Sequence, residues 1–265
     1  MKHHFPDDIL NKNGQVGILL VGAGGTGSQL LSGLARMHFA LGALDNPGFD
    51  VIVCDPDTIS AANVGRQLFS PADIGRNKAE CLVTRVNRFF GLDWGSSAKR
   101  AENVKGAAVD ILITAVDSAK ARKAVSGNFR EATYWLDTGN TSHTGQVVLG
   151  TIVDIPQPVQ AGTVQHLPTV LDLYPDMERQ DTSAKQGPSC SVAQALERQD
   201  LFINQMVATC ALQLLWSAFR KGYLTEHGVF VNLNPVSVRP LPVDPEAWKR
   251  MGWPAGAKKE GKRKK

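Results

Sequence analysis

The sequence has few cysteines and no long apolar run. Its 265 residues include four cysteines, and none of them belongs to a Cys-x-x-Cys pair. Because structural zinc sites commonly use such pairs, this spacing excludes the usual paired-cysteine site, and we expect no zinc. No stretch reaches the roughly 18 consecutive apolar residues of a membrane-spanning helix, and the first residues lack the apolar core of a secretory signal. We therefore expect a cytoplasmic protein without disulfides and without a membrane partner.

The sequence also has little net charge outside its last residues. The formal net charge is +4, but segment 258–265 contains six basic residues and one acidic residue. The rest of the chain has 23 basic and 24 acidic residues, so nucleic acid is not an expected partner. We expect a disordered tail that serves solubility. The alternative is a DNA-binding arm, which a steep salt dependence of DNA binding would reveal.

The pattern of apolar residues predicts an α/β fold. A chain of this length with 43% hydrophobic residues can bury the core of one domain. Short apolar runs alternate with helical stretches, which favours a mostly parallel sheet flanked by helices. The predicted strands span 16–21, 50–54 and 110–115, and the predicted helices span 26–38, 76–90 and 118–127.

The second half of the chain departs from this alternation. Two predicted strands, 133–137 and 146–153, are joined by a polar turn at 138–145, which favours antiparallel strands toward the C-terminal half. Segment 154–190 is too long for an ordinary connection within a compact domain, so we expect a functional or disordered loop. An apolar helix over 201–216, stopped near Lys221 and Gly222, and a final strand over 228–234 follow. We divide the chain into segment 1–14, one domain at 15–240 and an extension at 241–265.

A glycine-rich turn follows the first predicted strand. Glycines allow a tight bend and a close approach of the backbone to phosphate, and the start of the next helix offers free N–H groups. The second strand ends at Asp55, where a Rossmann fold has the carboxylate that binds ribose hydroxyls. The glycines of this turn are Gly22, Gly24, Gly25 and Gly27.

The residues after Asp55 distinguish the chain from a dehydrogenase. Asp55 lies 28 residues beyond Gly27 rather than roughly 20 beyond the loop, and the turn-rich segment 39–49 accounts for the excess. A dehydrogenase with a longer loop is the alternative interpretation. Hydride transfer has no need for further phosphate-sized polar contacts, whereas nucleotidyl transfer requires cations near the developing charge. The polar residues in question are Asn63, Arg66, Gln67 and Lys78.

Taken as a set, these motifs resemble those of the ThiF/MoeB/HesA adenylyltransferases, which are relatives of the ubiquitin-activating enzymes. The set comprises Gly-x-Gly-Gly-x-Gly, Asp-x-Asp, Asn-x-x-Arg-Gln, Ile-Gly-x-x-Lys and the strand-end Asp117, within residues 15–240. More narrowly, the chain resembles the ThiF-related proteins of the plasmid-borne PRTRC cassette, which also includes a small ubiquitin-like protein. The resemblance implies a Rossmann-like sheet, a crossover loop at about 154–190 over the acyl-adenylate site, and a homodimer.

The resemblance also implies roles for individual residues. Asp55 resembles the ribose ligand of the family, and Lys78 resembles its phosphate-binding lysine. Asn63 and Arg66, with the adjacent Gln67, resemble its triphosphate contacts. Asp117 resembles the aspartate that engages Mg²⁺. The residues leave alternatives open, because Arg66 and Lys78 could be solvated charges on a helix, and Asp117 could cap the helix that begins near residue 118.

Two further features concern later steps and departures from the family. Cys190 follows the crossover loop and precedes a predicted helix, where its thiol pKa could fall, and it is similar to the family cysteine that takes up an acyl or sulfur group. A structural thiol is the alternative there, and Cys54, Cys81 and Cys210 are predicted packing residues. No arginine precedes Gly14, although many relatives send an N-terminal arginine into the neighbouring ATP site. Arg76 and Arg179 are candidate substitutes.

The resulting prediction is an enzyme that uses ATP and Mg²⁺ to adenylylate a carboxylate. The expected substrate is the C-terminal glycine of a small ubiquitin-like protein, with release of pyrophosphate and an optional thioester on Cys190. One alternative acceptor is a carboxylate on modified tRNA, which the neutral body of the chain disfavours. Another alternative is a nucleotide-binding regulatory subunit that has lost catalysis.

Overall fold

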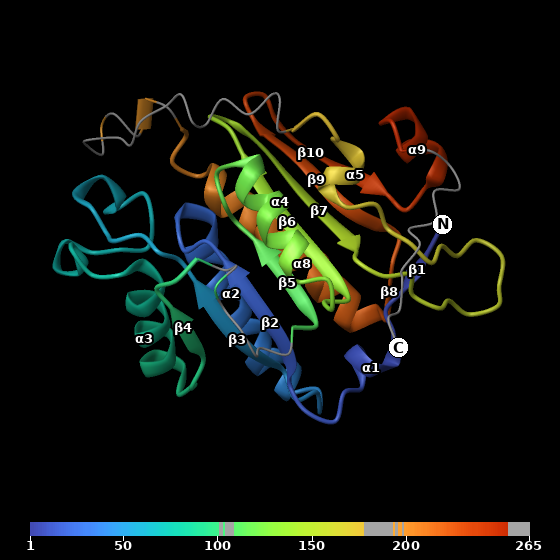
Figure 1. Cartoon of the computed structure of the whole chain (residues 1–265), viewed down its shortest axis with the longest axis horizontal. Helices are drawn as coiled ribbons and strands as arrows, with labels where there is room; N and C mark the ends of the chain where they lie inside the picture. The colour runs from blue at the N-terminus through green and yellow to red at the C-terminus, as the bar shows by residue number, and fades with distance from the viewer. Residues whose placement is uncertain (101–102, 104–108, 178–192, 194–195, 198, 254–265) are drawn as a thin grey trace.

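An eight-stranded sheet forms the centre of the computed structural model, which describes residues 1–100, 103, 109–177, 193, 196–197 and 199–253. The strand order is β10-β9-β7-β6-β5-β2-β3-β4 (Figure 1). The strands span β2 (Val16–Val21), β3 (Phe49–Cys54), β4 (Gly95–Ser97), β5 (Ile111–Thr114), β6 (Tyr134–Asn140), β7 (Thr144–Thr151), β9 (Glu226–Leu233) and β10 (Val236–Pro242).

The sheet is parallel in its first half and antiparallel in its second. Strand β2 pairs in parallel with both β3 and β5, and β4 and β6 extend this parallel part on either side. Strands β7, β9 and β10 then add in antiparallel order. The predicted Rossmann-like sheet with antiparallel strands toward the C-terminal half is therefore confirmed.

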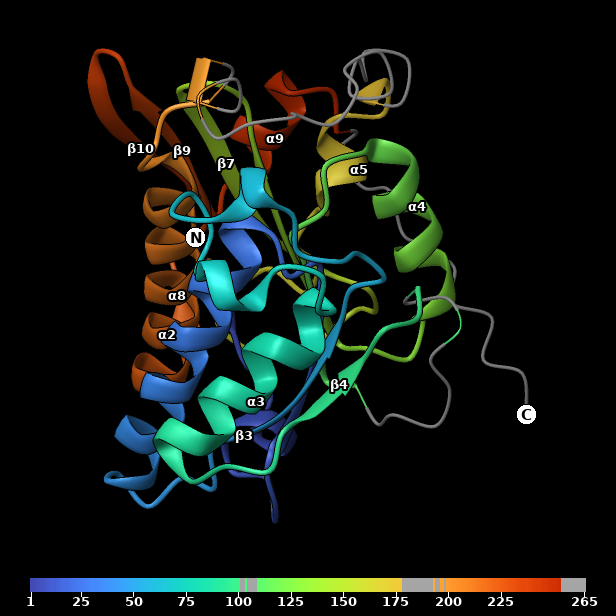
Figure 2. The same ribbon diagram turned by 90° about the vertical axis from the view of Figure 1, so that its left-hand side faces the viewer.

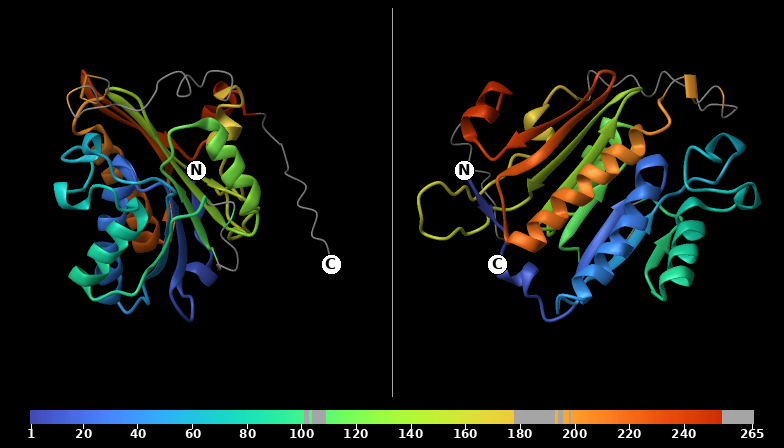
Figure 3. Two further views of the ribbon diagram at one scale, coloured as in Figure 1. Left: turned by 60° about the vertical axis from the view of Figure 1, so that its left-hand side comes forward. Right: turned by 180° about the vertical axis from the view of Figure 1, so that it is seen from behind.

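Helices cover both faces of the sheet (Figures 2 and 3). One face carries α2 (Gly25–Gly42), α3 (Lys78–Phe90) and α8 (Ile203–Lys221), and the other carries α4 (Ala119–Asn128), α5 (Val170–Leu173) and α9 (Pro245–Arg250). Because side chains alternate along a strand, Ile18 and Leu20 of β2 join the core beneath the first set, while Leu19 and Val21 join the core beneath the second. Both faces of the central strand are buried, which explains its continuous apolar run.

A small second sheet ties the N-terminal residues to the end of α8. Strand β1 (His3–His4) pairs antiparallel with β8 (Tyr223–Leu224), and α1 (Asp7–Leu10) follows β1. Phe5 stacks on Tyr134 of β6 with ring centroids 4.2 Å apart. Residues ahead of the predicted domain start are thus packed against its core.

Helix ends with strong local signals lie close to their predicted positions. Asn77 caps α3 by accepting a hydrogen bond from the backbone N–H of Glu80 at 3.0 Å. Helix α8 ends at Gly222, whose φ of 71° is the left-handed conformation that favours glycine. These capping residues explain why the two helices begin and end where they do.

Two predicted element boundaries were wrong, and the strand after the predicted final strand was missed. Helix α2 continues through Gly42 instead of ending near residue 38, because Leu41 is buried in the core and extends the apolar face. The predicted turn at 138–145 is shorter, since β6 runs to Asn140 and β7 begins at Thr144. The predicted final strand is followed by another, β10, which tolerates prolines because it lies at the edge of the sheet.

The predicted crossover loop is described only in part. Residues 154–177 form a connection that includes the short helix α5, whereas 178–192 lie outside the described residues, as does the tail from 254 onward. Within the described part of the chain, no helix is both long and apolar enough to cross a membrane.

Candidate functional site

Predicted site residues from three described segments lie beyond the carboxyl ends of the central parallel strands. The glycine turn follows β2, Asp55 follows β3, and Asp117 lies three residues beyond the end of β5. Strand β2 lies between β3 and β5. The chain therefore adds β3 next to one long edge of β2 and later crosses back to add β5 next to the other. Ligands of open α/β sheets bind in the crevice beyond the carboxyl ends of the strands at such a point.

Two glycines of the turn are required by the packing of the backbone. Gly22 has a φ of 96°, and a Cβ atom there would lie 2.4 Å from the carbonyl oxygen of Ala115. A Cβ atom on Gly27 would lie 1.9 Å from the carbonyl oxygen of Gly22. These positions bring the turn onto the strand ends, so their role is structural whether or not a ligand binds.

Gly24 differs from Gly22 and Gly27 because a Cβ atom added there would not clash with any neighbouring atom. The nearest atom to a Cβ there is Nε2 of Gln67, at 4.0 Å. Gly24 is also the N-cap residue of the 18-residue helix α2, whose first N–H groups have no partners within the helix. A ligand phosphate can therefore approach the backbone at this residue.

Asp55 is buried, with 6% of its surface exposed, and both of its carboxylate oxygens are hydrogen-bonded. The backbone N–H of Ala23 donates to one oxygen at 2.6 Å, and the backbone N–H of Asp57 donates to the other at 2.8 Å. Burial raises the pKa of Asp55, although these two bonds oppose the shift. An ionised carboxylate has roughly four acceptor positions, so about half of its capacity remains for ribose hydroxyls.

Lys78 is buried at the start of α3 and points to the segment after β3. Its Nζ lies 2.9 Å from the carboxylate of Asp57, and 8% of the residue is exposed. Asn77 holds the same segment by donating from its side chain to the carbonyl oxygens of Asp55 and Asp57 at 2.8 and 3.1 Å. The alternative of a solvated helix-face charge is therefore wrong for Lys78.

Arg66 and Gln67 contain buried polar atoms that lack partners among the described residues. These atoms are Nε of Arg66 and Oε1 of Gln67. Leaving a buried donor or acceptor unpaired costs about 1–3 kcal/mol, so such atoms point to a missing ligand or water. Burial lowers the pKa of Arg66, whereas the nearby carboxylate of Asp117 raises it.

Asp117 is exposed between β5 and α4. It does not cap α4, because the hydroxyl of Ser118 fills that role by accepting from the backbone N–H of Ala121 at 3.2 Å. The helix-cap alternative for Asp117 is therefore wrong. Within the described residues, no group of three or more His, Cys, Asp or Glu side chains could hold a metal ion by itself. A single carboxylate still fits Mg²⁺, which binds through one or two carboxylates together with substrate phosphates.

Asn63 has a local structural role in addition to its predicted one. Its side-chain oxygen accepts from the backbone N–H and the hydroxyl of Ser60 at 2.9 and 3.1 Å, which caps the short 3₁₀ helix η1 (Ala61–Asn63). The amide nitrogen of Asn63 is the part that can donate to phosphate, and that role stays a prediction.

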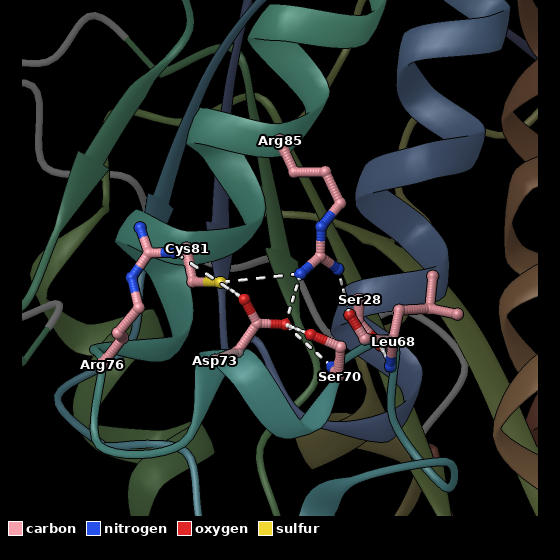
Figure 4. Close-up of polar contacts among 7 residues, drawn as sticks. All are labelled: Ser28, Leu68, Ser70, Asp73, Arg76, Cys81 and Arg85. Carbon is pink, nitrogen blue, oxygen red and sulfur yellow. Dashed lines mark hydrogen bonds and ion pairs between the residues drawn. The ribbon is translucent and has the colours of Figure 1, made fainter.

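Arg85 attaches the segment after Gln67 to α3 (Figure 4). Its guanidinium donates to the carbonyl oxygen of Leu68 and to the carboxylate of Asp73, both at 2.5 Å. Burial alone would raise the pKa of Asp73, but hydrogen bonds from Ser70, Cys81 and Arg85 hold it well below its usual range. This network fixes the backbone of the segment that follows Arg66 and Gln67 in the sequence.

The cysteines in the described residues are packing residues. Cys54 and Cys81 are buried, and burial raises the pKa of both thiols. Cys210 is partly buried against the core. Cys190 lies outside the described residues, so its predicted acyl-carrying role stays a prediction.

Arg76 and Arg179 stay predicted substitutes for an N-terminal arginine. Arg76 has an exposed side chain and lies 3.7 Å from Asp73, and Arg179 lies outside the described residues.

The sequence motifs missed two residues that contact the site from a distant part of the chain, Gln199 and Asn204. They also missed the buried ion pair of Arg122 and Asp137. None of these four belongs to a local motif, so only the fold reveals them.

Curated relatives match this chain over short regions. The NEDD8-activating enzyme E1 catalytic subunit of Drosophila melanogaster is 42% identical over 71 residues, which are 26% of this chain and 14% of that protein. The corresponding subunit of Caenorhabditis elegans is 35% identical over 116 residues, 42% of this chain and 25% of that protein. Human ubiquitin-like modifier-activating enzyme 1 is 35% identical over 85 residues, 32% of this chain and 8% of that protein. The matches thus span a quarter or less of these relatives.

Solved structures share the fold over most of the chain. E. coli MccB with ATP has a TM-score of 0.60 at 15% identity, covering 88% of this chain and 65% of that one. PaaA also has a TM-score of 0.60, at 11% identity, covering 89% of this chain and 75% of that one. The ThiF family profile matches residues 2–245. This chain therefore belongs to the ThiF family.

Proposed function

We propose that the protein adenylylates a carboxylate with ATP. The carboxylate oxygen attacks the α-phosphorus, the bond from that phosphorus to the bridging oxygen breaks, and pyrophosphate leaves. The product is an acyl-adenylate. The observation that carries the proposal is the pair of unpartnered buried atoms on Arg66 and Gln67, next to the open backbone at Gly24.

The residues of the site bind different parts of the nucleotide. Asp55 offers acceptor positions to ribose hydroxyls, and the backbone at Gly24 receives a phosphate. Arg66 and Lys78 offset the charge of the triphosphate and of the leaving pyrophosphate, with donors from Asn63 and Gln67 beside them. Asp117 would hold Mg²⁺, which would supply further charge neutralisation on the phosphates when bound.

No side chain needs to act as a base in this reaction. A terminal carboxyl group has a pKa of about 3.3–3.7, so it is ionised at neutral pH and already nucleophilic. The protein then has to align the carboxylate with the α-phosphorus and stabilise the charge that develops on the phosphates. This explains how cations and backbone N–H groups can suffice.

The C-terminal glycine of a small ubiquitin-like protein is the proposed substrate. Its support is membership of the ThiF family together with the names of the relatives, which activate NEDD8 or ubiquitin-like modifiers. A second step would follow if the thiolate of Cys190 attacks the acyl carbon, forming a thioester and releasing AMP. Homodimerisation, the PRTRC association and a cytoplasmic location stay predictions.

Exchange of radiolabelled pyrophosphate into ATP tests the proposal. We expect exchange that requires both Mg²⁺ and a ubiquitin-like protein ending in glycine, and that Asp117→Asn abolishes. The exposed Lys249→Ala, on the other face of the sheet, is the control and should leave exchange unchanged. Tight ATP binding without exchange on any carboxylate partner would contradict an enzyme and support the regulatory-subunit alternative.

A further inference from the structure

Gln199 connects three separate parts of the chain at the candidate site. Its side-chain oxygen accepts from Nη1 of Arg66 at 2.9 Å and from the amide nitrogen of Asn204 at 3.0 Å. Its own amide nitrogen donates to the carbonyl oxygen of Thr141, in the turn between β6 and β7, at 3.4 Å. One side chain thus contacts the segment after β3, the first turn of α8 and the β6–β7 turn.

Asn204 extends this connection to the glycine turn. It is 5% exposed, and its side-chain oxygen accepts from the hydroxyl of Thr26 in the first turn of α2 at 3.1 Å. A Cβ atom on Gly25 would lie 2.5 Å from the Asn204 amide, so the two segments are in close contact. The oxygen of Gln199 therefore sets the position of Arg66 relative to the glycine turn.

The backbone beside Gln199 is held independently of its side chain. The N–H of Asp200 donates to the carbonyl oxygen of Ser142 at 2.8 Å. Because this contact does not involve Arg66, the Gln199 side chain approaches the guanidinium from a fixed base. Such support is what a residue needs in order to orient another.

The partner of Arg66 is neutral, unlike the partners of the neighbouring cations. Lys78, Arg85 and Arg122 each contact a carboxylate, whereas no carboxylate of the described residues lies within ion-pair distance of Arg66. Its Nε is buried and has no partner among those residues. Arg66 is thus oriented without having its charge offset by an ion pair.

We infer that Gln199 is a positioning residue for Arg66, a neutral acceptor that fixes the guanidinium while leaving its charge for the phosphates of the nucleotide. This inference rests on the proposed function, since it assumes that a nucleotide binds beside Arg66. A carboxylate in the place of the amide would hold the guanidinium more strongly. It would also repel phosphate and compete with it for Arg66.

Substitution by glutamate separates positioning from charge. Gln199→Glu keeps the acceptor oxygen and strengthens its contact with Arg66, whereas Gln199→Ala removes the acceptor without adding charge. Binding of Mg²⁺-ATP and of AMP is measured by calorimetry for both variants and the wild type. We expect Gln199→Glu to weaken ATP binding by about tenfold or more, and AMP binding less. Gln199→Ala should weaken ATP binding by a smaller factor.

The opposite order of ATP affinities in these two variants would overturn the inference. If Gln199 only held the segments together, Gln199→Glu would bind ATP as well as the wild type and better than Gln199→Ala. Gln213→Glu, which adds the same charge on the exposed side of α8, is the control and should leave ATP binding unchanged. In an Arg66→Ala background, Gln199→Glu should weaken ATP binding much less than it does in the wild type. An undiminished loss of ATP affinity would contradict the inference.

Thermal unfolding of each variant shows whether it is folded. If Gln199→Glu does not fold, Gln199→Met takes its place, because methionine has a similar length and no carbonyl oxygen. We then expect weaker ATP binding by several-fold, and unchanged ATP binding would overturn the inference. A wild-type protein that binds no ATP would instead refute the proposed function itself, so the two failures are distinguishable.

Discussion

Arg122 and Asp137 form an ion pair that is closed to solvent. Nε of Arg122 lies 2.9 Å from the Asp137 carboxylate, and their side chains are 9% and 1% exposed. The hydroxyl of Thr114, at the end of β5, donates to the same carboxylate at 2.6 Å. Burial raises the pKa of Asp137 and the charge of Arg122 opposes that shift. The pair thus joins α4 to β5 and β6, and Asp117 lies between β5 and α4.

Breaking this pair should destabilise the fold strongly. Asp137→Asn would leave the Arg122 charge buried without its counterion, which costs about 3–5 kcal/mol of unfolding free energy. Asp93→Asn is the matched control, because Asp93 is exposed and its substitution should change the unfolding free energy by no more than about 0.5 kcal/mol. Urea denaturation of both variants measures the difference. Equal losses of unfolding free energy in the two variants would show that burial of the ion pair does not set the cost of breaking it.

Alanine substitutions in the glycine turn should separate folding from binding. Gly27→Ala places a Cβ atom 1.9 Å from a backbone oxygen, so the turn must shift and the melting temperature should fall by several degrees. Gly24→Ala meets no atom closer than 4.0 Å, so we expect near-native stability but weaker ATP binding, since the methyl group occupies the phosphate approach. Calorimetric melting and ATP titration test both variants. ATP binding by Gly24→Ala at wild-type strength would show that phosphate does not approach there.

Lys78→Ala should weaken nucleotide binding by about 10- to 100-fold, because a charged hydrogen bond contributes about 1.5–3 kcal/mol. Fluorescence titration with a labelled ATP analogue measures the change. Lys249→Ala, an exposed lysine on α9, is the control and should have no effect. Similar affinities for both variants would mean that the buried ammonium faces only Asp57.

Acid should destabilise the protein through two buried histidines. Burial lowers the pKa of His3 and of His227 from 6.5 to about 4. Between these values the unfolded chain binds more protons than the folded chain, so unfolding free energy falls as pH drops from 6.5 to 4. Each histidine should account for about 2 kcal/mol between pH 7.5 and 5.

The variant His227→Gln tests the origin of this pH dependence. Removing one titrating group should reduce the loss of unfolding free energy between pH 7.5 and 5 by about half. His143→Gln is the control, since His143 is exposed in the β6–β7 turn. An unchanged slope in His227→Gln would assign the acid sensitivity to other groups.

Local signals in the sequence were sufficient to predict the central part of the fold. The buried run of β2 and the glycine stop of α8 each depend on neighbouring residues. Strand β10 was missed because Pro240 within it argues against a strand, and only its place at the sheet edge makes that proline acceptable. Edge position is a property of the tertiary fold, which a local pattern does not contain.

The same distinction applies to the candidate site. Asp55 and Lys78 belong to short motifs, and the fold brings both to the carboxyl edge of the parallel strands. Gln199 is separated from Arg66 by 133 positions, and Asp137 from Arg122 by 15. Neither contact follows from spacing, because each depends on where two distant segments meet.

A crystal structure with Mg²⁺ and a non-hydrolysable ATP analogue would show where the nucleotide binds. We expect the ribose hydroxyls at Asp55, and the phosphates beside Nε of Arg66 and Nζ of Lys78. A nucleotide bound elsewhere, or phosphates that contact neither cation, would contradict this expectation.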